Sequence, residues 1–282
     1  MNILLQSYKK LRSILRPVRL RYEHLWFFFQ FRVRRMSAKV VNKVRKKSLF
    51  ANDFLILCIK KPIYASLVQD NINSLHIYNP RHRFTIITDS ACLPSLEKLT
   101  FDYPKQVKFL NNYSDDPRPW QFIKIDTAFL AAEMNTILVD ADTLWWSDPV
   151  VPAEGVVFQV KNKRFFDWHD EKISLSHIFG DQVQKEAFHY VTGFLRIPST
   201  YVTPKLKEAV ISLATKLWSF PQDTKIPLQN PTGLQRLCEE IALGYTLQTF
   251  IPPESITTLK ENDPYNDKNT MQSLYYGAIN GV

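Results

Sequence analysis

The chain has 282 residues, a net charge of +9 and 45% hydrophobic residues, which suits a globular protein with a sizeable core. Its 7 glycines and 17 prolines exclude a collagen-like or glycine-rich disordered chain. The cysteines Cys58, Cys92 and Cys238 form no CxxC pair, so neither a zinc ribbon nor a disulfide framework is indicated. We expect free, buried thiols, which favours a reducing compartment.

The positive charge is concentrated in the first 48 residues, which hold 14 Lys and Arg and one acid, Glu23. The remaining residues hold 22 basic and 26 acidic side chains, a net charge of −4. Specific nucleic-acid binding by this larger part of the chain is therefore not expected. Residues 1–50 are expected to form a basic amphipathic arm.

The arm alternates cationic and apolar residues at helical spacing and contains a short aromatic run, 25–29. That run is far shorter than the ~20 residues needed to cross a bilayer, and no signal-peptide cleavage site follows it. The mixture favours an interfacial helix on an anionic membrane surface. A helix packed on the rest of the chain or on a second subunit, or a nucleic-acid arm, also fits the pattern.

After the arm, short apolar runs of strand length alternate with helical patterns, which indicates an α/β fold with a mainly parallel sheet. The predicted strands are 54–60, 83–90, 106–110 and 136–142, and the predicted helices are 62–78, 93–99 and 119–133. Further along, we predict strands at 155–161, 189–198 and 246–252, and helices at 203–218 and 231–244. Pro231 near the start of the last helix and Gly244 just past its end match the usual helix signals.

The stretch NTILVDADTLWWSDP, residues 135–149, places two carboxylates at the end of a buried strand. In a parallel α/β sheet, ligands bind at the carboxyl ends of the strands. Asp140 and Asp142 are two residues apart, so in extended backbone both would point to the same side and could hold Mg²⁺ or Mn²⁺. The alternative is a solvated turn in which Asp142 or Thr143 caps a neighbouring segment.

Over residues 54–252 the chain resembles the GT-A glycosyltransferases, nucleotide-sugar-dependent enzymes with a Rossmann-like sheet and a DxD metal site. The resemblance rests on FLILCIK, RFTIITDS, PWQFIKIDTAFLAAEMNTILVDADTLWWSDP and HYVTGFLRIP, in that order. The helix followed by ILVDADT is similar to the K…a…ILyLDaDtl block of family-8-like and related transferases. HYVTGFLRIP is similar to the later NsGvmli strand.

The resemblance implies roles for single positions. Asp140 and Asp142 match the DxD: Asp142 would contact the metal most directly, and Asp140 would reach the ribose, the metal or both. Lys124 matches a basic position that often contacts the donor, and Thr88 and Asp89 match a region that lines the nucleoside pocket. Lys124 as a solvated helix residue and Asp89 as a cap of the following helix are the alternatives.

Two further assignments follow from the resemblance. Gly193 would let the backbone approach the sugar or the acceptor, unless it marks a bulge in its strand. Glu239 and Glu240 lie on a late helix, where many inverting members carry the catalytic base, or else face solvent there. The chain ends MQSLYYGAINGV, without the histidine element that supplies a third metal ligand in family-8 enzymes.

These features predict a single GT-A catalytic domain over 51–282, with a nucleotide-binding half at 51–150, an acceptor-side half at 151–260 and a tail at 261–282. The expected reaction is transfer of a sugar from a nucleoside-diphosphate donor, UDP-sugar being favoured, to a glycan or lipid-linked acceptor. The arm favours a cytoplasmic enzyme at the inner face of the membrane. A nucleotidyltransferase and a catalytically inactive GT-A-fold binding or scaffold protein are the alternatives.

Overall fold

The computed structural model describes residues 51–113, 116–145, 148–149, 151–152, 154–164, 188–223, 231–260 and 271–273. These residues belong to one compact unit, Leu49–Ser273. The second unit, Met1–Ser48 with Leu274–Val282, lies outside the described residues, and so do the predicted basic arm and most of the tail.

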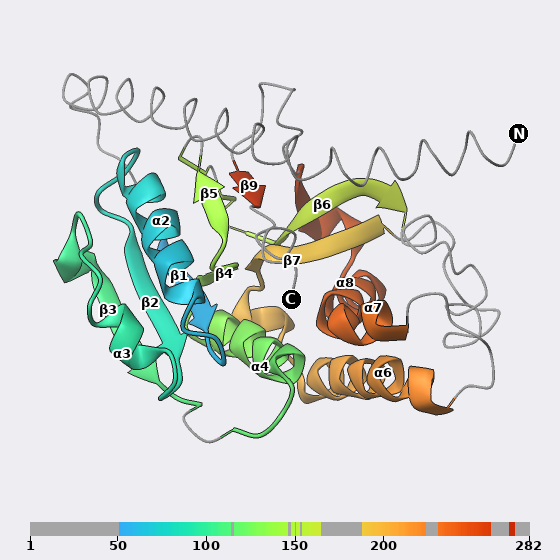
Figure 1. Cartoon of the computed structure of the whole chain (residues 1–282). Coiled ribbons are helices and arrows are strands. Elements are labelled where there is room, and N and C mark those ends of the chain that lie inside the picture. The colour runs from blue at the N-terminus through green and yellow to red at the C-terminus, as the bar shows by residue number, and fades with distance from the viewer. Residues whose placement is uncertain are drawn as a thin grey trace, which may run out of the picture. The chain divides into compact units, whose positions relative to one another are not determined.

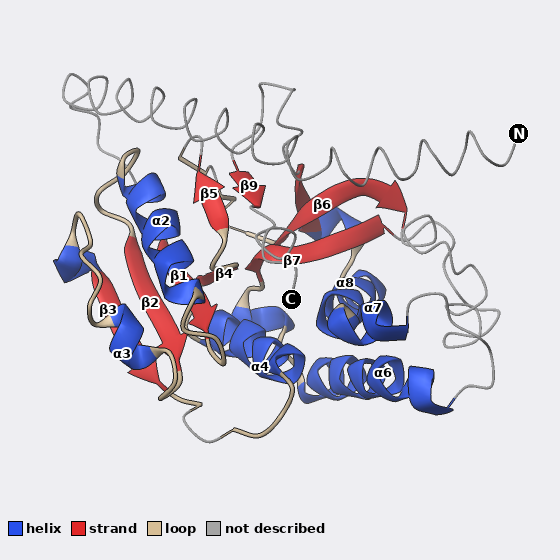
Figure 2. Cartoon of the chain, in the orientation of Figure 1, coloured by secondary structure: helices blue, strands red, loops and turns tan. Residues whose placement is uncertain are grey.

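The unit is built on a seven-stranded sheet with the order β3-β2-β1-β4-β7-β6-β8, seen in Figure 1 and, by element type, in Figure 2. The strands are β1 (Asp53–Cys58), β2 (Arg83–Thr88), β3 (Val107–Asn111), β4 (Ile137–Val139), β6 (Val156–Arg164), β7 (Phe188–Arg196) and β8 (Ile256–Lys260). Only β7 runs against its neighbours in this sheet. The predicted α/β class with a mainly parallel sheet is therefore confirmed.

Helices cover both faces of the sheet. They are α2 (Tyr64–His76), α3 (Leu93–Leu96), α4 (Trp120–Glu133), α6 (Pro204–Asp223), α7 (Pro231–Arg236) and α8 (Cys238–Phe250). Alternate residues of β1 enter two different cores: Phe54 and Ile56 pack with α2 and α3, whereas Leu55 packs with α4, α6 and α8. This division follows from the two-residue period of a strand that is buried on both faces.

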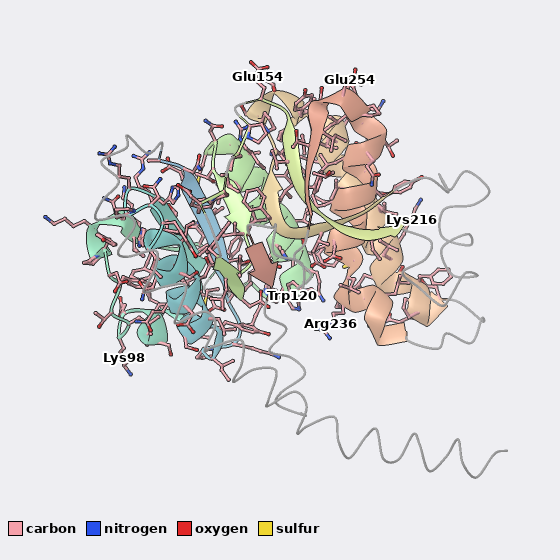
Figure 3. All side chains as sticks on the ribbon, turned by 90° about the horizontal axis from the view of Figure 1, so that it is seen from above. Lys98, Trp120, Glu154, Lys216, Arg236 and Glu254 are labelled. Carbon is pink, nitrogen blue, oxygen red and sulfur yellow. The ribbon has the colours of Figure 1, made fainter. Side chains whose placement is uncertain are left out.

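The strand order reverses next to β1. The chain moves from β1 outward to β2 and β3, then returns through α4 to β4 on the other side of β1. The carboxyl ends of β1 and β4 therefore flank the topological switch point, where ligands of open α/β sheets bind. Figure 3 labels Trp120, the first residue of α4, on the side of the sheet opposite Glu154 and Glu254, which precede β6 and β8.

A second, two-stranded sheet pairs β5 (Thr143–Trp145) antiparallel with β9 (Met271–Ser273). After β5, the Asp148 carboxylate accepts a hydrogen bond at 2.7 Å from Nε2 of His82, a fully buried residue at the start of β2. His82 Nδ1 accepts the backbone N–H of Asn52, which assigns the proton to Nε2. The segment that follows β4 is thus held by the pairing of β5 with β9 and by the bond from His82 to Asp148.

The late helices differ from the predictions. The single helix predicted at 231–244 is broken at Leu237 into α7 and α8, and α8 continues to Phe250. Gly244 lies inside α8, and the strand predicted at 246–252 is wrong. Leu243 and Leu247 are both buried in the same core, so tertiary packing at helical spacing overrides the local β preference of this segment. The three cysteines are buried and free, as predicted.

Gly155 provides a test of this fold, because its backbone has φ +79° and a Cβ there would lie 2.5 Å from the Ser255 carbonyl oxygen. We expect Gly155→Ala to lower the free energy of unfolding by about 2 kcal/mol or more, through backbone strain and steric clash. Urea denaturation measures the change. Glu154→Ala, at the exposed neighbour, should stay within about 0.5 kcal/mol of wild type; equal stability of both variants would contradict this packing.

Candidate functional site

The DxD segment forms a turn at the carboxyl end of β4. Strand β4 ends at Val139, the Asp140 N–H donates to the Gly193 carbonyl at 3.0 Å, and the Thr143 N–H donates to the Asp140 carbonyl at 3.2 Å. The prediction that extended backbone aligns Asp140 and Asp142 is therefore wrong, because the chain already turns at Asp140. Both side chains are half-buried.

A buried asparagine of α2 holds this turn. Asn71 Nδ2 donates to the Asp140 carbonyl at 2.7 Å, and Asn71 Oδ1 accepts the indole N–H of Trp145 at 2.7 Å. Ser74 Oγ, one turn further along α2, accepts the Trp145 backbone N–H at 3.2 Å. Because Asn71 and Trp145 are completely buried, these bonds fix the turn to the core. Sequence reasoning missed Asn71, whose only signal was an amide on the buried, mainly apolar face of α2.

Lys124 connects α4 to the turn. Its side chain is only 8% exposed, and its Nζ lies 2.6 Å from Asp140 Oδ1 and 3.8 Å from Glu239 Oε1. Burial lowers the pKa of Lys124, but the Asp140 and Glu239 carboxylates more than offset this, so the pKa stays above its ordinary value. The ammonium is therefore charged, and the interpretation of Lys124 as a solvated helix residue is wrong.

Glu239 and Glu240 occupy the first turn of α8 and are both buried, so the solvent-facing interpretation is also wrong. Glu239 Oε2 is buried with no hydrogen-bond partner among the described residues. Burial raises the pKa of Glu239 to about 8; Lys124 opposes this shift and the Glu240 carboxylate adds to it. A buried carboxyl group whose pKa lies near neutral pH and whose oxygen lacks a hydrogen-bond partner is a candidate proton acceptor or metal ligand.

Asp142 belongs to the same electrostatic cluster. Burial, followed by repulsion from Asp140, raises the pKa of Asp142 to about 7, against a smaller opposing effect of Lys124. Three separate elements, α4, the turn after β4 and α8, thus bring one ammonium and several carboxylates together. Acidic groups therefore outnumber basic ones at the switch point.

The carboxylates of this cluster do not form a complete metal site by themselves. Among the described residues, no group of three or more His, Cys, Asp or Glu side chains is arranged to hold a metal ion. Magnesium and manganese sites that process nucleotides often use one or two carboxylates, with water and substrate phosphates completing the shell. Asp140 and Asp142 supply two such carboxylates, so a cation bound by them would need water and substrate phosphates to complete its shell.

Thr88 and Asp89 have structural partners at the carboxyl end of β2. Asp89 Oδ1 accepts the Cys92 N–H at 2.9 Å, and Oδ2 accepts the Lys60 N–H at 2.7 Å. The Asp89 carboxylate therefore caps the turn that leads into α3, whose own N-cap residue, Cys92, has no side-chain cap bond. Lys60 has φ 67°, so the Asp89 carboxylate stabilises a strained residue in the loop after β1. Thr88 is fully buried beside it.

Gly193 contacts the DxD turn through its backbone carbonyl. The pairing of β7 with β6 shifts between Leu195, opposite Phe158, and Val191, opposite Gln159, so Gly193 lies within an irregular part of the strand. The alternative of a bulge is therefore supported. The Gly193 carbonyl accepts the Asp140 N–H, so this irregular segment helps to hold the DxD turn.

Comparison of the chain with models of known protein families finds no match, and comparison with curated protein sequences finds none either. In the part of the chain that the structure describes, no helix has the length and apolarity needed to cross a membrane.

Removing the Asn71 amide should loosen the DxD turn. Asn71→Ala leaves the Trp145 indole N–H and the Asp140 carbonyl without this partner, so we expect a loss of about 2 kcal/mol in the free energy of unfolding. Asn73→Ala, on the same helix, removes only an exposed bond to the Asp102 N–H and should cost less than half as much. Urea denaturation that ranks the two variants in the opposite order would contradict this role.

The raised pKa of Glu239 predicts a pH-dependent stability. Between about pH 5 and pH 8 the unfolded glutamate has lost its proton while the folded one retains it, so the free energy of unfolding should fall as pH rises. In chelator-containing buffer, the wild type should lose roughly 1 kcal/mol per pH unit relative to Glu239→Gln in this window. Exposed Glu97→Gln is the control and should follow wild type. A constant wild-type-to-Glu239→Gln difference from pH 5 to 8 would refute the buried protonated state.

Proposed function

We propose that the chain is a GT-A-type glycosyltransferase that transfers a sugar from a nucleoside-diphosphate donor, UDP-sugar being favoured, to a glycan or lipid-linked acceptor. The observation that carries this proposal is the cluster of Lys124, Asp140, Asp142 and Glu239 at the switch point of a mainly parallel sheet. The resemblance around ILVDADT supports the same activity.

The cluster offers complementary partners for a diphosphate. Asp140 and Asp142 would hold Mg²⁺ or Mn²⁺ together with the phosphate oxygens, and the cation would stabilise the negative charge of the leaving nucleoside diphosphate. Lys124 is a fixed positive charge 2.6 Å from Asp140, so it both orients that carboxylate and lies next to the anionic leaving group.

The reaction also needs a group that accepts a proton. The acceptor hydroxyl oxygen forms a bond to the anomeric carbon, the bond from that carbon to the diphosphate oxygen breaks, and the hydroxyl proton moves to a base. Glu239 is a buried carboxyl group of the cluster that is not assigned to the metal; its pKa, raised to about 8, gives it a high proton affinity, so it would accept this proton in its ionised form. Glu240 is the neighbouring buried carboxyl of the same helix turn.

The proposed lipid-linked acceptor is suggested by the basic residues of the arm. A basic amphipathic arm at residues 1–50 would place the enzyme on an anionic membrane surface, at the cytoplasmic face, next to a lipid-linked acceptor. The aromatic stretch 165–168, which could contact such an acceptor, also lies outside the described residues.

Nucleotide binding tests the proposal. We expect one of UDP, GDP, CMP and dTDP to raise the melting temperature in the presence of Mn²⁺, since a ligand at a hundred times its Kd stabilises by ~2.7 kcal/mol. Asp142→Ala should abolish the shift, whereas Glu254→Gln, an exposed carboxylate at the opposite edge of the sheet, should retain it. No shift with any nucleotide would contradict the proposed function. A shift without sugar transfer or donor hydrolysis would favour the inactive binding protein.

A further inference from the structure

An exposed tryptophan lies beside the cluster. Trp120 is the first residue of α4 and is 39% exposed, although an indole is one of the largest apolar surfaces a protein can bury. Figure 3 shows Trp120 away from Glu154 and Glu254, and Lys124, which contacts the Trp120 ring, reaches Asp140 of the DxD turn. The predictions from sequence gave Trp120 no role.

The Trp120 ring is coupled to the charged cluster through Lys124. The two residues are four apart on α4, so they lie on one face of the helix. Lys124 Nζ is 5.9 Å from the centroid of the Trp120 ring and 2.6 Å from Asp140 Oδ1. The indole is therefore within one side-chain length of the position where a diphosphate would be held, and the cation–π contact helps to keep the ring in place.

The groups around this ring suit a sugar. The nearby polar groups are an ammonium and carboxylates, which bond to the hydroxyl groups of a sugar. A flat aromatic face complements the apolar C–H face of a pyranose, and a few placed polar groups then fix its orientation. The sugar is also the group directly bonded to the diphosphate.

We propose that Trp120 stacks on the pyranose ring of the donor sugar, and that the substrate is a nucleoside-diphosphate hexose. This inference rests on the proposed function and deepens it. Trp120 is then a specificity-determining residue that contacts the transferred group, while Lys124 and the two aspartates bind the diphosphate. Trp120 should therefore strengthen binding of the nucleotide-sugar but not of the free nucleotide.

Isothermal titration with UDP, UDP-glucose and UDP-galactose in Mn²⁺ tests the proposal on wild type, Trp120→Ala and Trp120→Phe. We expect Trp120→Ala to weaken the better-bound UDP-hexose about 5- to 10-fold, the range of an aromatic stacking contact, and UDP by less than about twofold. Trp120→Phe keeps an aromatic face and should recover most of the loss. Circular dichroism and the Kd for UDP show whether each variant is folded.

Phe250→Ala is the matched control. Phe250 is 38% exposed and has Lys205 Nζ 5.8 Å from its ring centroid, but it lies at the end of α8 opposite to Glu239. Its loss should leave the Kd of every ligand unchanged. Equal weakening of UDP and UDP-hexose by Trp120→Ala, or no weakening of either, would overturn the stacking role while leaving the proposed function in place. Wild type that binds none of these UDP ligands and none of GDP, CMP and dTDP would overturn both.

Discussion

The carboxyl edge of the sheet depends on one buried ammonium. Lys124 is nearly inaccessible to solvent, and a lone buried charge is too costly to persist, so its carboxylate partners are a condition of the fold. Asp140 comes from the turn after β4 and Glu239 from the start of α8. Elements more than a hundred residues apart are therefore tied together at the switch point. Removing Asp140 would leave the buried Lys124 ammonium without its nearest carboxylate.

The same arrangement explains why this edge is suited to chemistry. Carboxylates outnumber the ammonium, and the raised pKa values of Asp142 and Glu239 show that burial and mutual repulsion are only partly compensated. In the proposed function, a bound cation would offset this repulsion. Asn71 and Gly193 hold the DxD backbone from two sides, so the charged groups are placed before any ligand binds.

The sequence predicted most of the strands and helices in the right order, because alternating apolar runs and helical periods are local signals. It also predicted Asp140, Asp142, Lys124 and Glu239 as site residues, and the structure brings them together. The extent of α8 and the conformation of the DxD segment depend instead on long-range packing. The core contacts of Leu243 and Leu247 extend α8 through a segment with β-favouring residues, and the bond from Thr143 to Asp140 turns the DxD out of the strand. The role of Asn71 depends on contacts about seventy residues away, which no local pattern encodes.

The central claim is that Asp140 and Asp142 hold a divalent cation jointly with a nucleoside diphosphate. Electron paramagnetic resonance of Mn²⁺ measures this directly, because the sharp signal of the free ion disappears when it binds. The account predicts weak Mn²⁺ binding by the protein alone, tight binding of one Mn²⁺ per chain when UDP is added beyond that of UDP itself, and loss of this gain in Asp140→Asn and Asp142→Asn. Mn²⁺ binding that is unchanged by UDP, or unchanged in both variants, would contradict it.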